Sequence, residues 1–95
     1  MKKIIWAPNA LEQMNDIVDY IAMDSESRAE EWAISIIDAV ERLAEFPESG
    51  RIVKDVDNPS IKEIVKGNYR IVHQIQKNKI EILVVKNVRQ SSTFE

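Results

Sequence analysis

The segment GNYRIVHQI, residues 67–75, indicates the architecture of the whole chain. Gly67 and Asn68 are turn residues, and the seven residues after them alternate in character with a period of two. This is the period of a β-strand, whose successive side chains point to opposite faces of a sheet. One face would carry Tyr69, Ile71, His73 and Ile75, and the other would carry Arg70, Val72 and Gln74. We expect the first set to pack against helices and the second set to lie on an open face.

Three further segments predict strands that pair around this one. They are RIVKDV at 51–56, IKEIVK at 61–66 and IEILVVKNVR at 80–89. Short turns separate the strands, so consecutive strands should run antiparallel. Such a sheet can bury one face under helices and leave the other face open.

The first half begins with a short strand, KKIIWA at 2–7, and a first amphipathic helix. Pro8 suits the first turn of that helix, where its missing N–H is no loss. The apolar stripe recurs at helical spacing and consists of Leu11, Met14, Ile17, Val18 and Ile21.

A second helix is predicted over residues 25–46, with Ser27 and Glu30 as a capping box at its start. Phe46–Pro47 should stop it. Its apolar stripe consists of Ala29, Trp32, Ala33, Ile36, Ile37, Val40, Leu43 and Ala44. Both helices need a surface to cover, which predicts an α+β, two-layer single domain over 1–95 in the order β-α-α-β-β-β.

Composition excludes several classes of function. The 95 residues are 44% hydrophobic and 31% charged, and they include no cysteine and one histidine. We therefore expect no disulfide, no metal site and no cofactor, and the lack of cysteine fits a reducing cytoplasm. No stretch is long and apolar enough to cross a bilayer, so no membrane partner is expected.

Charge is distributed unevenly along the chain. Residues 1–50 hold four Lys or Arg against eleven acids, whereas residues 51–95 hold nine against five. The basic half could meet an acidic partner, or both halves could be solvated faces. Because the pI is only about 5.2, a protein partner is favoured over nucleic acid.

Four segments, taken in order, resemble the RelE/ParE superfamily of type II toxins. They are YIAMDSESRAEEW, FPESGR, IKEIVKGNYRIVHQI and ILVVKNVRQ, and together they span most of the chain. The long second helix and the SGR turn are more similar to the ParE branch. The resemblance implies a RelE/ParE-like fold, a cytoplasmic toxin neutralised by a cognate antitoxin in a hetero-oligomer, and a role in plasmid stabilisation.

The two branches imply different targets. ParE-type members arrest growth by inhibiting DNA gyrase, whereas RelE-type members cut mRNA on the ribosome without a metal. Arg70 and Arg89 match arginines of the RelE pattern and could clamp a phosphate. However, Glu63 follows Lys62 where a cation would be wanted, and Phe94 and Glu95 stand where that pattern has a tyrosine. We predict a protein-binding gyrase inhibitor rather than an enzyme. An endoribonuclease using Arg70 and Arg89, or a decayed toxin that only binds antitoxin, remain as alternatives.

Individual residues carry further expectations. The predicted partner-binding residues are Arg51, Lys62, Arg70, Lys86 and Arg89. A structural alternative for Arg70 is an ion pair with Glu63 or Glu81 on a neighbouring strand. His73 shares strand parity with apolar residues, which favours a packed, hydrogen-bonded core histidine over a catalytic one. Trp6 and Trp32 lie in apolar stripes and are expected in the core.

Overall fold

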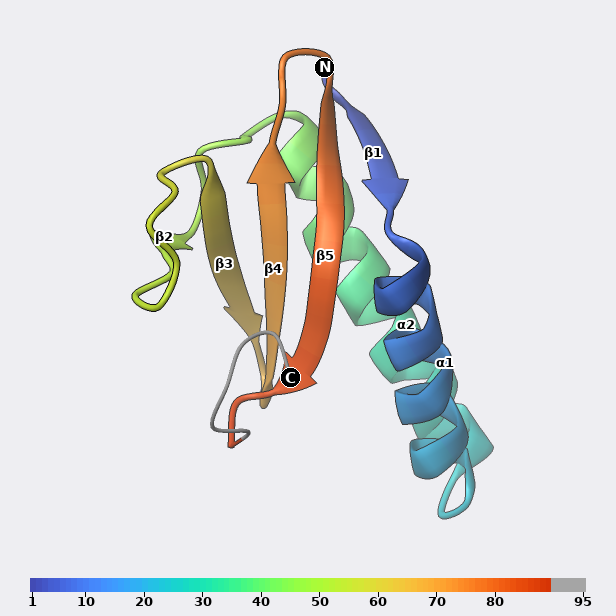
Figure 1. Ribbon diagram of the computed structural model, residues 1–95. Coiled ribbons are helices and arrows are strands. Elements are labelled where there is room, and N and C mark those ends of the chain that lie inside the picture. Colours follow the sequence, from blue (N-terminus) through green and yellow to red (C-terminus); the bar gives the residue numbers. More distant parts are fainter. Residues whose placement is uncertain (90–95) are drawn as a thin grey trace.

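The computed structural model describes residues 1–89, which form two helices on one side of a mixed sheet (Figure 1). The strands are β1 (Lys3–Trp6), β2 (Arg51–Ile52), β3 (Ile61–Lys66), β4 (Tyr69–Ile75) and β5 (Lys79–Asn87). The helices are α1 (Pro8–Ala22) and α2 (Glu26–Glu41), and α2 continues into the 3₁₀ turn η1 (Arg42–Ala44). The predicted α+β class and the predicted order of elements are confirmed.

The sheet has the strand order β1-β5-β4-β3-β2. Strands β2 to β5 form the predicted antiparallel meander, whereas β1 pairs in parallel with β5 and makes the sheet mixed. The predicted strand over 51–56 is a strand only at Arg51–Ile52. The chain then leaves the sheet and returns at β3.

Two glycines with positive φ lie next to β3, one in the turn that follows it and one just before its partner β2. Gly67 has φ +60° and, with Asn68, links the paired residues Lys66 and Tyr69. A positive φ at the first central position alone is the requirement of a type II′ hairpin turn. Gly50 has φ +97°, and a Cβ there would collide with the backbone carbonyl of Glu63. A side chain at position 50 would therefore push β2 away from β3.

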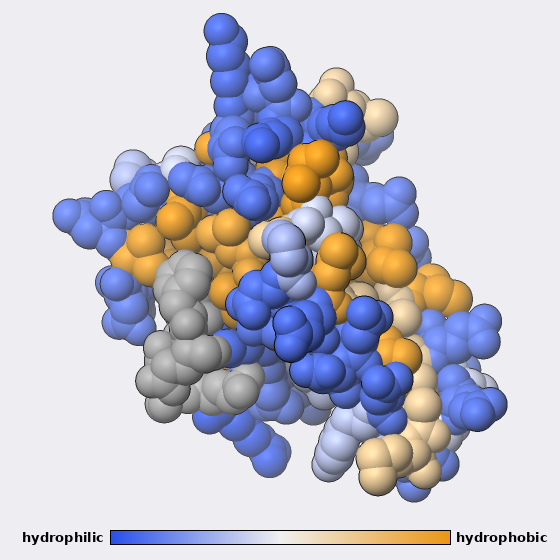
Figure 2. Space-filling view, turned by 45° about the vertical axis from the view of Figure 1, so that its right-hand side comes forward, coloured by the Kyte–Doolittle hydropathy of each residue, from blue (hydrophilic) through white to orange (hydrophobic). Residues whose placement is uncertain are grey.

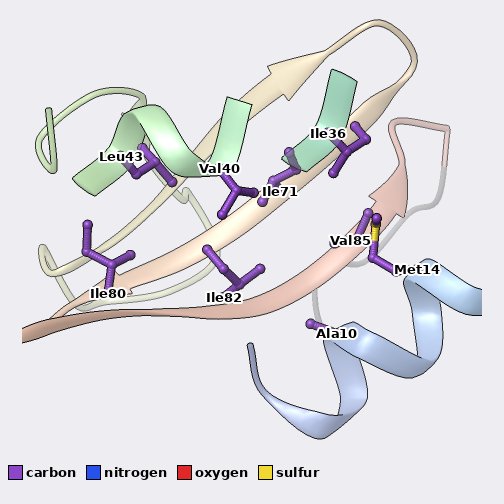
Figure 3. Close-up of a cluster of buried hydrophobic side chains, with 9 residues drawn as sticks. All are labelled: Ala10, Met14, Ile36, Val40, Leu43, Ile71, Ile80, Ile82 and Val85. Carbon is purple, nitrogen blue, oxygen red and sulfur yellow. The ribbon is translucent and has the colours of Figure 1, made fainter. Parts of the chain in front are cut away.

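The main core lies between the helices and the sheet (Figure 3). Ile36, Val40 and Leu43 of the second helical segment meet strand residues of β4 and β5, and α1 closes the other end. The buried members are Ala10, Met14, Ile36, Val40, Leu43, Ile71, Ile80, Ile82 and Val85. Both tryptophans are partly buried against this cluster, and Trp32 packs edge-on against Tyr69 with ring centroids 5.0 Å apart.

A β-bulge in β5 lets residues on both sides of it contribute to this core. Val72 pairs with Val84 and His73 pairs with Ile82, so Leu83 is an extra residue on β5. Ile82 and Val85 therefore both reach the helix side although they are three residues apart. The continuous apolar run ILVV gave no sign of this bulge in the sequence.

The opposite sheet face is less open than expected. Val72 and Val84 are buried there with Val53, against Val56 of the segment that follows β2 and Ile61 at the start of β3. The expectation that Val72 would lie on an uncovered face was wrong, because the segment between β2 and β3 folds over that part of the sheet.

The helix boundaries and stripes also differ from expectation. The N-cap of α2 is Ser25, whose hydroxyl accepts a hydrogen bond from the Arg28 N–H at 3.2 Å, so the predicted capping box at Ser27 was wrong. Leu11 and Ile37 are 49% and 43% exposed, so each apolar stripe is narrower than predicted. Figure 2 shows that the side carrying α1 and β1 is mostly hydrophilic with separate apolar patches.

Candidate partner-binding face

The strand register places Arg70 on the sheet face away from the helices. Arg70 pairs with Val65 of β3 and Lys86 of β5, and directly paired residues share a face. Its neighbour Ile71 belongs instead to the helix-side core. We call the side of Glu63, Arg70 and Lys86 the open face. The prediction that Tyr69 and Arg70 point to opposite sides is confirmed.

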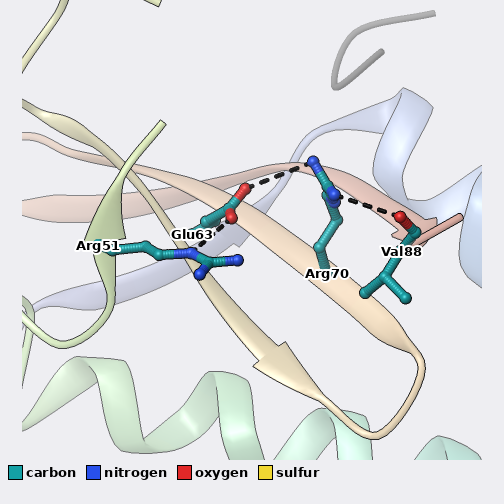
Figure 4. A network of polar contacts seen from close by, with 4 residues as sticks. All are labelled: Arg51, Glu63, Arg70 and Val88. Atoms are coloured by element: carbon teal, nitrogen blue, oxygen red, sulfur yellow. Dashed lines mark hydrogen bonds and ion pairs between the residues drawn. The ribbon is translucent and has the colours of Figure 1, made fainter. Parts of the chain in front are cut away.

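A buried carboxylate organises the arginines of the open face (Figure 4). Arg51 Nε lies 2.8 Å from one Glu63 oxygen, and Arg70 Nη1 lies 3.7 Å from the other. Arg70 also donates through Nη2 to the carbonyl of Val88 at 3.4 Å. The Glu63 side chain is 7% exposed, compared with 22% for Arg70 and 68% for Arg51. The Glu63 pairing is thus present, whereas Glu81 accepts from Gln76 instead.

These groups line a pocket of about 270 Å³, which we call the arginine pocket. Its walls are Arg51, Ile52, Val53, Lys54, Asp55, Glu63 and Arg70. Three cationic and two acidic side chains meet there, so the local charge is nearly balanced. The pocket is therefore not a simple anion site.

The remaining predicted cations are not all on this face. Lys86 is buried beside Arg70, and Arg89 is exposed just beyond β5, where its N–H donates to the Asn87 side chain at 2.9 Å. Lys62 pairs with His73 and lies on the helix side of β3. Its ammonium group lies 3.2 Å from a Glu48 carboxylate oxygen. The structure thus brings Arg51, Arg70 and Lys86 together and keeps Lys62 apart from them. Phe94 and Glu95 lie outside the described residues.

His73 is fully buried on the helix side, as its strand parity predicted. The expected hydrogen bond is missing, because neither ring nitrogen has a bonded partner within residues 1–89. Burial lowers the pKa of His73, and the nearby Pro47 carbonyl opposes this without reaching hydrogen-bonding geometry. Lys62 lowers the pKa further and Glu48 raises it. A neutral, enclosed imidazole is unsuited to proton transfer with a substrate on the open face.

A second groove, which we call the helix groove, lies between α1 and the end of β5 and has a volume of about 440 Å³. Its lining residues are Gln13, Asp16, Ile17, Tyr20, Tyr69, Val85, Lys86 and Asn87. Gln13 Oε1 accepts a hydrogen bond from the Val85 N–H at 2.8 Å, where β1 no longer pairs with β5. Sequence reasoning missed this groove. The available signal was the spacing of Gln13, Asp16 and Tyr20 along one edge of the helix.

Comparison with known proteins decides the family. The profile of the family described as the ParE toxin of the type II toxin-antitoxin system parDE matches residues 4–91. The chain belongs to this toxin family. The resemblance to the RelE/ParE superfamily is therefore confirmed, and the protein is a ParE-type toxin of a type II toxin–antitoxin system.

Individual relatives agree with this assignment. A Sinorhizobium fredii protein, Y4kP, whose name proposes that it is a toxin, is 34% identical over 91 residues, covering 94% of this chain and 91% of that protein. Toxin RelE2 of Caulobacter vibrioides is 36% identical over 52 residues, covering 55% of this chain and 59% of RelE2. A solved structure of the chromosomal ParDE system from P. aeruginosa superposes with a TM-score of 0.73 at 17% identity, covering 92% of this chain and 96% of that chain. The last match shows the shared fold.

Within residues 1–89, no three His, Cys, Asp or Glu side chains gather in a way that could hold a metal ion. Neither α1 nor α2 combines the length and apolar character that crossing a bilayer requires.

Proposed function

We propose that this ParE-type toxin arrests growth by binding and inhibiting DNA gyrase. Family membership supports this proposal, and the observation that carries it is the position of Glu63. Metal-free RNA cleavage needs cations that stabilise a charged phosphorane and groups that transfer protons. On the described part of the open face, Glu63 already engages Arg51 and Arg70. His73 and Lys62, the other candidates, lie on the helix side.

The same toxin would be silenced by a cognate antitoxin in the cytoplasm, within a toxin–antitoxin hetero-oligomer. Arg51, Arg70, Lys86 and Arg89 give the open face and its end a basic character that would speed encounter with an acidic segment. The helix groove adds apolar surface from Ile17, Tyr20 and Tyr69. Peptide segments commonly bind such a combination of groove and charged rim.

An mRNA endonuclease is the second candidate, with the ribosome and mRNA as partners. It is favoured by Arg70 on the open face and by the exposed Arg89 at the end of β5. The two guanidinium groups would contact the scissile phosphate. A toxin that has lost activity and retains only antitoxin binding is the third candidate.

Induced expression without antitoxin separates the three. Growth, transcript integrity and plasmid supercoiling should be followed together, with Lys77→Ala in the β4–β5 turn as a matched loss of one exposed cation. Growth arrest with intact transcripts and altered supercoiling is the result expected for gyrase inhibition. Transcripts cut at codon-phased positions, with cleavage abolished by Arg70→Ala and Arg89→Ala, would replace the gyrase proposal by the nuclease. Absence of arrest, with antitoxin binding retained, would leave only the inactive toxin.

A further inference from the structure

We infer that Glu63 is a selectivity residue whose carboxylate excludes phosphate from the arginine pocket. The open face then keeps a basic rim that attracts protein but lacks a clamp for a nucleic-acid backbone. This inference goes beyond the proposed function, because it concerns which ligands the pocket rejects and does not depend on which cellular target is inhibited.

The geometry of the pocket supports this role. Strand β3 lies between β2 and β4, so Arg51 and Arg70 approach Glu63 from its two neighbouring strands. Each arginine faces a different oxygen of the same carboxylate, at 2.8 Å and 3.7 Å. A guanidinium group presents its donors to carboxylate and phosphate oxygens in the same way. The carboxylate therefore already engages the guanidinium donors and offsets the positive charge that a phosphate held between the two arginines would need.

This internal anion is difficult to displace. Glu63 is fixed in a strand that is paired on both sides, with Arg51 opposite it on β2 and Val72 opposite it on β4. Its side chain is almost completely buried, so moving it into solvent would break its contacts with both arginines. A phosphate entering the pocket would also meet Asp55 in the lining. Two negative charges repel each other most strongly where water is partly excluded, so Glu63 and Asp55 disfavour phosphate binding in this pocket.

Two further cations lie on the β5 side of Arg70. Lys86 lies beside Arg70 across the β4–β5 pairing, and Arg89 follows the end of β5. Lys62, the cation next to Glu63 in sequence, points to the other side of the sheet and pairs with Glu48. The arrangement keeps long-range attraction for acidic groups, while the paired arginines are already engaged by an internal carboxylate.

The test is a titration of the intact chain with inorganic phosphate at low ionic strength, observed at the arginine Nε–H signals in ¹⁵N spectra. Glu63→Gln should bind phosphate at Arg51 and Arg70 at least about fivefold more tightly than the native chain, the gain expected in water when a negative charge about 4 Å from the ligand is removed. With a single-stranded uridine decamer, the salt dependence of binding should steepen by about 0.7, as expected for one added phosphate contact.

Glu81→Gln is the matched control, because it makes the same charge change on β5, two strands away from Glu63, where Glu81 contacts Gln76. If Glu63→Gln binds phosphate no more tightly than Glu81→Gln, the inference is wrong. It is equally wrong if the native chain binds phosphate at Arg51 and Arg70 as tightly as Glu63→Gln does.

Removing one partner of a buried ion pair is destabilising, so the folding of Glu63→Gln is checked by circular dichroism before the titration. The native-chain titration keeps the inference testable in either case. Since growth arrest and supercoiling are not measured here, failure of the gyrase proposal would not be confused with failure of this one.

Discussion

Replacing His73 by leucine should stabilise the protein, although it removes the only histidine of the chain. The imidazole is fully buried and neither ring nitrogen has a bonded partner within residues 1–89. A buried polar group without a hydrogen bond costs about 1–3 kcal/mol, and leucine removes that cost at similar volume. We expect the free energy of unfolding at pH 7.5 to rise by about 1–2 kcal/mol, or the Tm to rise by about 4–16 °C in a domain of this size.

The same substitution should change the pH dependence of stability. Burial lowers the pKa of His73 in the folded chain below its ordinary value of 6.5, so the unfolded chain binds the proton more readily. The proton therefore favours unfolding as the pH falls below 6.5 and has no effect well above it. His73→Leu should remove this loss, so its advantage over the native chain should grow between pH 7.5 and pH 5.

Urea denaturation at pH 5.0, 6.0 and 7.5, followed by the fluorescence of Trp6 and Trp32, measures both effects. His73→Asn is the matched control, because it keeps a polar group but cannot titrate. The control should flatten the pH dependence without the gain at pH 7.5. A His73→Leu protein that is no more stable than the native chain at pH 7.5, and that loses stability in parallel with it at lower pH, would refute the reasoning.

Five further substitutions test local features of the fold. Gly50→Ala should lower the free energy of unfolding by about 1–3 kcal/mol, because position 50 has a positive φ and an added Cβ would collide with the Glu63 backbone. Gly67→Ala should lower it by only about 1 kcal/mol, because an added Cβ there meets open space. Thermal denaturation measures both changes. Ser25→Ala should lower the free energy of unfolding by about 1 kcal/mol, and Ser27→Ala should lower it less, as measured by circular dichroism melting. The reverse order would show that Ser27 caps the helix. Gln13→Ala should destabilise the protein by about 1–2 kcal/mol and speed hydrogen exchange of the Val85 amide, which donates to Gln13. An unchanged exchange rate would show that the Gln13 side chain does not protect that amide.

Local patterns in the sequence predicted most of the architecture. The period-two alternation of residues 69–75 placed Arg70 and Ile71 on opposite faces, and the structure confirms this. Pro8 marked the start of α1 correctly because its fixed φ and missing N–H suit that position. These features depend on neighbouring residues only, so a single sequence contains them.

Features that depend on tertiary contacts were not predictable in this way. The bulge at Leu83 is set by how β4 and β5 pair, and the apolar run around it has no turn residue to mark it. The cap at Ser25 rather than Ser27 depends on which residue is extended where α1 meets α2. The engagement of Glu63 by two arginines requires the register of three strands, and short-range patterns do not supply that register.

The fold converts an asymmetry along the sequence into an asymmetry across the molecule. The acidic half of the chain forms both helices, and the basic half forms the four antiparallel strands whose far face they leave uncovered. A uniformly basic sheet face would bind phosphate backbones of any sequence, because that attraction needs only cations. One buried acid at Glu63 changes this without removing the long-range field, since the field sums over all the charges of the basic half whereas the clamp depends on two particular arginines. Attraction and short-range selection are thus set by different residues of the same face, so Glu63→Gln should change phosphate binding far more than it changes the rate of encounter with an acidic protein.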